Sequence, residues 1–400
     1  MGDGYLHGIK EDIAGDGLFD QFFEWYDDRN SYAKEWKERT GGKVVGSLCT
    51  YTPEEVLTAA NCLTVRLLGF HEPQDVTEPY LFAMFCPFSR DTLAQGLKGK
   101  LDHLDGVVMA HSCLHLRQTY SVMKHKLPVE FAWYLPIPNN VKDKYAKEFM
   151  ASEIERFKES VGEWRGFKID ENRLEDAITL MDKNRHLLRT VYEYRKDDNP
   201  HLTGMEALAM VTASELVDKH DANREIEKIL KYLPSRKIKT GSKVGSRLIV
   251  IGSEDDDMSF AHMVEHEDAT VVVDEHCTGT RWFWKEIGPR HDNLSQERRI
   301  GDRYCSRPAC PTKDYAMEDG TRLRFLHILK LCGDYNVDGA LLIQQKFCDP
   351  HEGDMVPLKE FLSEHDIPSL QLEFDVTLPL GQFKTRVEAF LETIGEEDLF

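Results

Sequence analysis

The chain has 400 residues, of which 41% are hydrophobic and 30% charged, and its 50 basic and 70 acidic side chains give a net charge of −20. Such an excess of negative charge opposes binding to the phosphate backbone of nucleic acids, and no apolar run approaches the roughly 20 residues that span a bilayer. We therefore expect neither a nucleic-acid partner nor a membrane segment. Since no basic stretch followed by an apolar one opens the sequence, we expect no secretory signal and a cytoplasmic location.

Residues 1–42 are predicted to form a helical N-terminal extension, and residues 43–139 then alternate between strand-like and helix-like patterns. The apolar, β-prone segments are KVVGSLCTY, LTVRLLGF, GVVMAHS and FAWYLP; the helical segments between them are PEEVLTAANCL, SRDTLAQGLKGKL and LHLRQTYSVMKHK. Ser89 is the predicted N-cap of the second helix. Repeated β-α-β units predict a parallel, doubly wound sheet, so we interpret residues 43–139 as a first α/β domain.

Residues 140–240 show only the helical period and are predicted to form a helical connector. Strand-like segments return in residues 241–400 as RLIVIGS, ATVVVDEH, GALLIQQ and SLQLEFDV, with helical segments between them. This pattern predicts a second α/β domain. The predicted fold is therefore α/β, with two Rossmann-like doubly wound parallel-sheet domains joined by a mainly helical segment.

Two strands of the predicted domains end in a similar way. The pair Asp105-Gly106 opens an apolar strand that leads to Cys113, and the pair Asp338-Gly339 opens one that leads to Cys348. Ligands of open parallel sheets bind outside the carboxyl ends of the strands. If the two domains face each other, these thiols can meet across the cleft.

The chain has nine cysteines, an odd number that argues against a disulfide framework and leaves buried thiols, metal ligands or a nucleophile. Cys86 lies in a loop before Pro87 and a predicted helix, where the helix dipole favours a thiolate. Cys86, Cys113 and Cys348 could hold a metal or a cluster, or could be unrelated buried thiols; spacing alone does not decide. Cys62 and Cys332 lie in apolar, helix-like surroundings and are interpreted as packing residues.

Several blocks in one order resemble the benzoyl-CoA reductase and 2-hydroxyacyl-CoA dehydratase family over residues 43–396. They include FCPFSRDTLAQGLKGKLDHLDGVVMAHSCLHLRQ, DEHCTGTRWFW, GDRYCSRPACPTKD and DGALLIQQKFCDPHEGDMVPLKEFLSEHDIPSLQLEFD. The resemblance implies that Cys86, Cys113 and Cys348 bind the iron of a 4Fe-4S cluster between two cluster-binding domains. Cys310, which shares the sequence CSRPAC with Cys305, is a secondary candidate for an extra ligand; buried or loop thiols are the alternative for both.

Three residues near the predicted strand ends are candidate proton donors. His115 follows Cys113 closely, and an imidazole titrates near neutral pH. Tyr51 and Glu54 lie just beyond the first strand, although a carboxylate in the first turn of a helix more often interacts with the helix dipole. His111 is interpreted as a strand-end histidine that is hydrogen-bonded to the backbone.

The resemblance implies an iron-sulfur subunit that takes part in low-potential, one-electron reduction of an aromatic acyl-CoA thioester, which dearomatises the ring. The sequence has no G-x-x-x-x-G-K-[ST] motif, so ATP hydrolysis is assigned to a partner. The implied partners are a sister subunit of similar fold and an ATP-hydrolysing iron-sulfur activator. The alternatives are a subunit of a 2-hydroxyacyl-CoA dehydratase, which acts through a ketyl radical, and a noncatalytic electron carrier or maturation protein.

Overall fold

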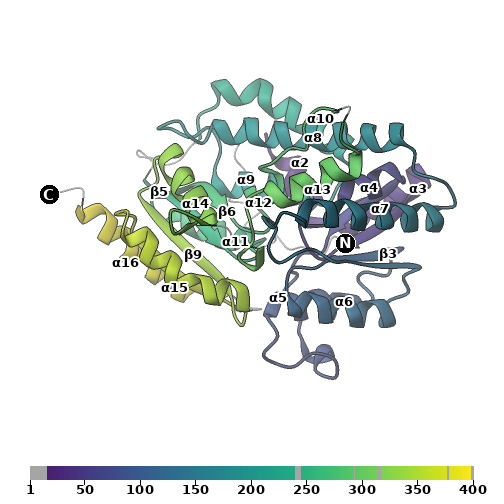
Figure 1. Ribbon diagram of the computed structural model, residues 1–400. Helices are drawn as coiled ribbons and strands as arrows, with labels where there is room; N and C mark the ends of the chain where they lie inside the picture. The colour runs from purple at the N-terminus through teal and green to yellow at the C-terminus, as the bar shows by residue number, and fades with distance from the viewer. Residues whose placement is uncertain (1–15, 239–244, 292, 314–316, 376–377, 398–400) are drawn as a thin grey trace.

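Two four-stranded parallel sheets form the framework of the structure, a computed structural model that describes residues 16–238, 245–291, 293–313, 317–375 and 378–397 (Figure 1). The first sheet has the order β2-β1-β3-β4 and the second β10-β9-β5-β6. The strands of the first sheet are β1 (Lys43–Ser47), β2 (Cys62–Arg66), β3 (Gly106–Ala110) and β4 (Phe131–Leu135). Those of the second are β5 (Ser246–Gly252), β6 (Ala269–Glu275), β9 (Gly339–Gln345) and β10 (Ser369–Phe374). The predicted α/β class with two Rossmann-like sheets is confirmed.

Both sheets use the same strand order and the same interaction between their central strands. Asp105 precedes β3, and its carboxylate accepts a hydrogen bond of 2.8 Å from the backbone N–H of Val44 in β1. Asp338 precedes β9 and accepts one of 2.7 Å from the N–H of Arg247 in β5. Each aspartate N–H also donates back to the carbonyl of the same partner, at 2.8 Å in both sheets. The similar sequences that begin with the two Asp-Gly pairs therefore form the same structural unit in both sheets.

Helices occupy most of the chain between and around the strands. Before and within the first sheet lie α2 (Asp20–Asp27), α3 (Arg29–Thr40), α4 (Glu54–Ala59), η1 (Asp75–Thr77), α5 (Pro87–Leu97) and α6 (Leu114–Lys126). Between the sheets lie α7 (Ala146–Arg165), α8 (Glu171–Glu193), α9 (Gly204–Ser214), α10 (Lys219–Tyr232) and η2 (Leu233–Ser235). The second half contains α11 (Met258–His266), α12 (Thr280–Phe283), α13 (Gln296–Ser306), η3 (Pro311–Lys313), the hairpin β7 (Met317–Glu318) and β8 (Thr321–Arg322), α14 (Leu323–Asp334), α15 (Asp349–Ser363) and α16 (Leu380–Glu397).

Three of the four α-helices of the connector, α8, α9 and α10, begin at side chains that accept hydrogen bonds from the first turn. Asp170 caps α8, and Thr203 and Glu206 form a capping box at the start of α9. Each such cap is worth about 1 kcal/mol. Figure 1 shows α8 and α10 above the two sheets in that view. The predicted boundary between residues 240 and 241, like residues 1–15 of the predicted N-terminal extension, lies outside the described residues.

Two local predictions differ from the structure. Ser89 is not the N-cap of α5; that position belongs to Cys86, and the Ser89 hydroxyl lies inside the helix, where it donates a 2.8 Å hydrogen bond to the carbonyl of Cys86. Pro87 explains the shift, because its fixed φ suits the first helical position and so moves the start of the helix forward. Cys62 lies in strand β2 rather than in helical surroundings, although it is buried as expected.

Alternating side chains of each sheet enter apolar cores on its two faces, as the pleat of a β-strand requires. In β1, Val44 and Val45 belong to different core clusters, and in β5 Leu248 and Ile249 do the same. All four are fully buried. Both sheets are therefore covered on both sides. No helix within the described ranges is both long and apolar enough to cross a membrane.

A segment of the second half completes the core of the first. Ile300 and Tyr304 of α13 belong to the same apolar cluster as Val45 of β1. The Tyr304 hydroxyl donates to the carbonyl of Thr52 at 2.5 Å. Arg307 donates to the carbonyl of Thr50 at 2.7 Å. Residues near 300–310 thus pack on the loop that follows β1, far from their neighbours in sequence.

A buried ion pair joins the two sheets. Arg66, the last residue of β2, donates to one carboxylate oxygen of Glu254, which follows β5, at 2.6 and 3.2 Å. Glu215, which lies after α9, is 3.9 Å from the same guanidinium. All three side chains are buried, and burial raises the pKa of Glu215 well above its usual value, so the charge that Arg66 offsets in this region of low dielectric is that of Glu254.

We expect the substitution Arg66→Ala to lower the free energy of unfolding by about 3–5 kcal/mol, because it leaves the buried Glu254 carboxylate without its cation. Urea unfolding followed by circular dichroism measures this loss. Lys330→Ala, which removes an exposed pair with Asp334, serves as the control and should change the free energy by less than about 1 kcal/mol. Equal losses in the two variants would contradict the prediction.

Candidate functional site

Three cysteines occupy the same position, the N-cap, in three different helices. Cys113 lies between β3 and α6, Cys348 between β9 and α15, and Cys86 directly before α5. None of the three side chains makes a capping hydrogen bond to its own helix. Their thiols are therefore not used for capping, and the positive end of a helix dipole lies next to each.

The three thiols are close enough to influence one another. Burial raises the pKa of Cys113, and the charge of Cys86 raises it further. Burial also raises the pKa of Cys348, with added contributions from Cys86 and Cys113. Cys86 is buried, whereas the other two are partly exposed. The structure thus brings together the three cysteines that the sequence singles out.

Their role as cluster ligands remains a prediction. Within the described residues, no three histidine, cysteine or acidic side chains are arranged to hold one metal ion. The thiolates of a 4Fe-4S cluster bind different iron atoms, so they lie farther apart than the ligands of a single ion. The raised pKa values mean that the free thiols are protonated, and metal binding would have to displace these protons.

Three further thiols surround this group. Cys49 and Cys310 each raise the pKa of Cys113, and Cys277 raises that of Cys348. Cys277 also accepts a 3.3 Å hydrogen bond from Arg281. Sequence reasoning named Cys310 as a candidate but overlooked Cys49 and Cys277; the available signal was that both come two residues after a strand, at the carboxyl edge of a sheet.

Cys305 lies apart from these six cysteines. It is buried in α13, and burial raises its pKa to about 11, followed by the charge of Asp302. The other charges that affect this thiol come from Lys147, Lys142 and Arg298. The two cysteines of CSRPAC therefore have different surroundings, and only Cys310 lies near the three N-cap thiols.

His115 connects the loops that hold the three thiols. The backbone N–H of Cys86 donates to its Nδ1 at 3.1 Å, so this nitrogen is the unprotonated one. Its Nε2 lies 3.8 Å from the carboxylate of Asp349, the residue after Cys348. Phe85 packs on the ring at a centroid distance of 4.6 Å. Burial lowers the pKa of His115, although Asp349 opposes this effect.

A buried ionic network lies behind Cys348. The thiol is 3.3 Å from Nδ1 of His351, and Nε2 of that histidine is 3.4 Å from Arg281. Arg281 and Arg324 both pair with Glu275, and all three side chains are fully buried. Burial alone would raise the pKa of Glu275, but the two arginines lower it to about 2. Sequence reasoning did not find His351, although the spacing Cys-x-x-His in "CDPH" was visible.

The other two candidate proton donors have different surroundings. The hydroxyl of Tyr51 accepts a 3.3 Å hydrogen bond from the N–H of Cys310, and burial raises the pKa of Tyr51 to about 12. Glu54 accepts a 2.7 Å hydrogen bond from the indole of Trp282 and lies 3.7 Å from Lys219. No hydrogen bond joins Glu54 to a cysteine side chain among the described residues. Tyr51 therefore lies beside the thiols, whereas Glu54 interacts with the helical connector.

His111, interpreted from the sequence as bonded to backbone, has a side-chain partner instead. Its Nδ1 contacts the hydroxyl of Tyr134 in the neighbouring strand β4. Burial lowers the pKa of this imidazole, and the charges of Lys313 and Arg117 lower it further. Because His111 directly follows β3 in the sheet, a side chain on the adjacent parallel strand is within reach.

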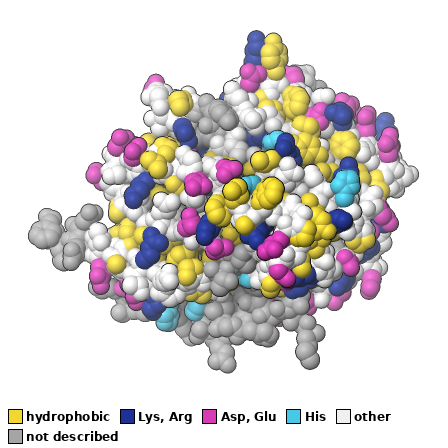
Figure 2. Space-filling model, turned by 90° about the horizontal axis from the view of Figure 1, so that it is seen from below, with side chains coloured by type: hydrophobic (Ala, Val, Ile, Leu, Met, Phe, Trp, Pro, Cys, Tyr) yellow, Lys and Arg dark blue, Asp and Glu magenta, His cyan; other side chains and the backbone are white. Residues whose placement is uncertain are grey.

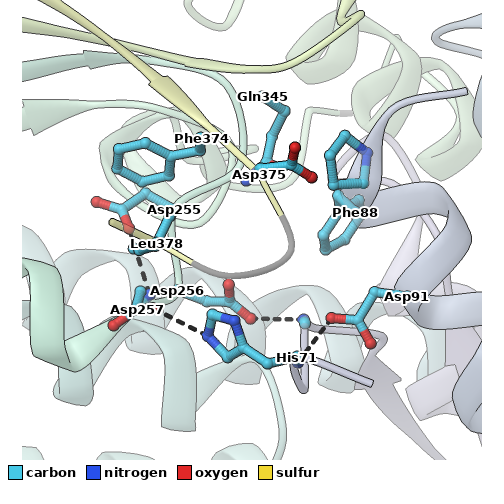
Figure 3. Close-up of a pocket in the computed structure, with 12 residues that line it drawn as sticks. His71, Phe88, Asp91, Asp255, Asp256, Asp257, Gln345, Phe374, Asp375 and Leu378 are labelled. Atoms are coloured by element: carbon cyan, nitrogen blue, oxygen red, sulfur yellow. Dashed lines mark hydrogen bonds and ion pairs between the residues drawn. The ribbon is translucent and has the colours of Figure 1, made fainter. Parts of the chain in front are cut away.

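A small acidic pocket lies at the contact between the two sheet units (Figure 3). Figure 3 shows His71 pointing toward Asp257, and the two side chains are 2.9 Å apart. Asp91 accepts from the N–H of Phe70 at 2.8 Å. Asp256 accepts from the N–H of Gly69 at 2.6 Å. With a volume of about 30 Å³, the pocket is a structural contact between aspartates and backbone N–H groups rather than space for a substrate.

Asp256 gives this contact a predicted pH dependence. Burial raises its pKa from 3.8 to about 6, although Arg29 opposes the shift. The folded protein therefore binds this proton more tightly than the unfolded chain, so its contribution to stability is complete below pH 4 and is lost as the pH rises to about 6. The shift corresponds to about 3 kcal/mol.

The variant Asp256→Asn cannot titrate at this position but can still accept from Gly69. Relative to the unsubstituted protein, we expect its free energy of unfolding to rise by up to about 3 kcal/mol between pH 4 and pH 7. Urea unfolding of both proteins across this range measures the difference. If the free energies of unfolding of the two proteins depend on pH in the same way, Asp256 does not titrate between pH 4 and pH 7.

Known proteins resemble the chain over most of its length. The sequence model of the family described as "2-hydroxyglutaryl-CoA dehydratase, D-component" matches residues 49–394. The (R)-phenyllactyl-CoA dehydratase beta subunit of Clostridium sporogenes is 25% identical over 382 residues, which cover 95% of this chain and 99% of the relative. The beta subunit of (R)-2-hydroxyglutaryl-CoA dehydratase of Acidaminococcus fermentans is 26% identical, covering 88% and 93%. A benzoyl-CoA reductase subunit from Thauera aromatica is 21% identical, covering 86% and 88%.

Proposed function

Because the chain belongs to the 2-hydroxyglutaryl-CoA dehydratase D-component family, we propose that it is the 4Fe-4S-binding subunit of an enzyme that acts on an acyl-CoA thioester. The observation that supports this most is the placement of Cys86, Cys113 and Cys348 at three helix N-termini, within electrostatic reach of one another. Thiolates are the usual ligands of such clusters. Three helix dipoles that end near the thiols favour the negative charge of a thiolate-bound cluster.

The surrounding residues suit a group that must be held and kept from bulk water. Cys86, Cys113 and Cys348 would hold the iron, and the cluster, when bound, supplies one-electron transfer. His115 fixes the backbone at Cys86 through its Nδ1. His351, in contact with Cys348, is itself held by the buried Arg281. We assign His115 and His351 to positioning the thiols; His115 and Tyr51 are also the nearest candidates for proton transfer.

Two reactions fit this proposal, and different observations favour each. The blocks DEHCTGTRWFW and RPACPTKD resemble reductase subunits, which favours reduction of an aromatic acyl-CoA ring. Two relatives named as dehydratase beta subunits are 25% and 26% identical, which favours dehydration of a 2-hydroxyacyl-CoA, whereas a third dehydratase beta subunit is 21% identical, as is the reductase subunit. A noncatalytic electron carrier with the same cluster is a third, less supported possibility.

The proposed partners are a sister subunit of similar fold and an ATP-hydrolysing activator. Relatives are named as subunits, which supports an assembly. Exposed apolar side chains flank the cysteines: Phe82 and Met84 precede Cys86, Leu114 follows Cys113, and Phe347 precedes Cys348. Such residues commonly mark protein contacts. Figure 2 shows hydrophobic side chains among acidic and basic ones on the face seen from below. The nine cysteines are free, as is usual in the reducing cytoplasm, which supports a cytoplasmic location.

Replacing any one of Cys86, Cys113 and Cys348 with Ala should remove most of the iron, because each thiolate binds a different iron atom. Iron and sulfide analysis after anaerobic purification, together with the visible absorbance, measures the loss. Cys62→Ala and Cys332→Ala are matched controls at buried cysteines, which should keep the iron and cost about 1 kcal/mol of stability. Full iron content in Cys348→Ala would refute the ligand assignment.

The reaction can be identified with the chain copurified with its sister subunit and activator. Ring reduction consumes reductant in proportion to product, whereas dehydration releases water and leaves the reductant unspent after activation. We expect ATP-dependent turnover of either benzoyl-CoA or a 2-hydroxyacyl-CoA. Product analysis and the amount of reductant consumed per product show which of the two reactions occurs. An iron-loaded complex that converts neither class of thioester would contradict the enzymatic proposal.

A further inference from the structure

A second pocket, distinct from the acidic one, has a cationic lining. Its volume is about 240 Å³, and it lies beside α13 and the start of α14. Five of the side chains that line it are cationic: Lys142, Lys285, Arg307, Lys313 and Arg324. Among the described lining residues there is no carboxylate. In a chain with a net charge of −20, this concentration of positive charge is unexpected unless it meets an anion.

Two of these cations have no partner among the described residues. No hydrogen bond or ion pair joins the ammonium groups of Lys142 or Lys285 to another side chain in the part of the chain that the structure describes. Both side chains are exposed to solvent. Partial desolvation lowers the pKa of Lys142, and the charges of Lys147 and Lys285 lower it further, although the charge of Cys305 opposes this effect. Like charges held together without a counter-charge are destabilising, and a bound anion would relieve this repulsion.

Arg307 and Arg324 have hydrogen-bond partners, but each also has a donor nitrogen without one. Arg307 binds the backbone and hydroxyl of Thr50 through its two terminal nitrogens, at 2.7 and 2.6 Å. Arg324 pairs with Glu275 and Asp354. The buried Nε atoms of Arg307 and Arg324, and Nε2 of His327, have no hydrogen-bond partner among the described residues. Buried polar nitrogens without partners are rare and costly, so a ligand that accepts hydrogen bonds would stabilise them.

The pocket also has an aromatic and apolar wall. Trp284 and Leu323 line it, and the ring of Trp284 meets that of His327 edge-on at a centroid distance of 5.9 Å. The indole and imidazole rings therefore form a fixed surface beside the cations. A flat base can pack against such a surface, as nucleobases do on aromatic side chains.

We propose that this pocket binds the nucleotide end of an organic phosphate, with its phosphate oxygens accepting hydrogen bonds from Lys142 and Lys285 and its base against Trp284. The volume suits part of such a ligand rather than all of it. The identification of this ligand as the CoA portion of a thioester rests on the proposed function. The anion site itself rests on the lining of the pocket.

One residue links the pocket to the thiols. Lys313 lines the pocket, and its pKa is lowered by burial and raised by the charges of Cys310, Cys49 and Cys113. Its ammonium group donates to the carbonyl of Ile137 at 3.3 Å. A ligand anchored by its phosphates at the lysines would thus have its remaining length available to extend toward Cys113.

The test uses the full chain and adenosine 3′,5′-bisphosphate, which has phosphates and a base but no thioester. Binding is measured by calorimetry and by the fluorescence of tryptophan. We expect the double variant K142Q/K285Q to bind the probe at least about tenfold more weakly, because charge-assisted hydrogen bonds to phosphate are lost. Lys168→Gln, at an exposed lysine outside the pocket, should bind as the unsubstituted protein does.

The proposal is overturned if the unsubstituted protein does not bind the probe, or if the double variant and the Lys168→Gln control bind it equally. Inorganic phosphate should bind at least about tenfold more weakly than the probe, since it cannot stack on Trp284; equal affinity would overturn the nucleotide assignment. Iron content and acyl-CoA turnover are measured in parallel. If the protein holds iron and converts a thioester but does not bind the probe, only this inference is refuted. If it binds the probe but neither holds iron nor converts a thioester, only the proposed function is refuted.

Discussion

A carboxylate at the start of each central strand fixes both sheets. Asp105 and Asp338 each exchange two hydrogen bonds with the second residue of the neighbouring strand, so the strands cannot slip by one residue without losing a charge-assisted bond. The positions of Cys113 and Cys348 follow from this register, because each lies a fixed number of residues beyond its aspartate. The placement of the strand-end thiols therefore depends on two side chains at the opposite edge of the sheets.

Several arginines are buried near the thiols although the chain as a whole is acidic. Arg281, Arg307 and Arg324 are buried, and the arginines near Cys277 and Cys348 hold Glu275 ionised. Burying so many cations is costly unless each meets an anion. The net negative charge and the buried arginines thus have separate roles: the first opposes unspecific association with polyanions, and the second stabilise buried carboxylates such as Glu275.

Much of this arrangement could be predicted from local sequence patterns. Apolar, β-prone runs in alternation with helical segments predicted the two sheets, and strand-end position identified Cys113 and Cys348, because these signals depend only on near neighbours. Ser89 was misplaced as a cap because Pro87 moves the start of the helix. The contacts of His115 with Cys86, and the approach of Cys310 to Tyr51, join residues 29 and 259 positions apart. No local pattern encodes such distances; they follow from tertiary packing alone.

The packing of α13 against the loop after β1 has a consequence for the order in which the chain folds during synthesis. Ile300, Tyr304, Cys305 and Cys310 complete an apolar core whose other buried residues come from the first half of the chain. While the ribosome is still making the connector, one face of the first sheet is without its cover. Because domains usually fold as they emerge, at about 5–20 residues per second, that apolar face waits several seconds for the residues near 300–310 and is open to chaperones or to aggregation in the meantime.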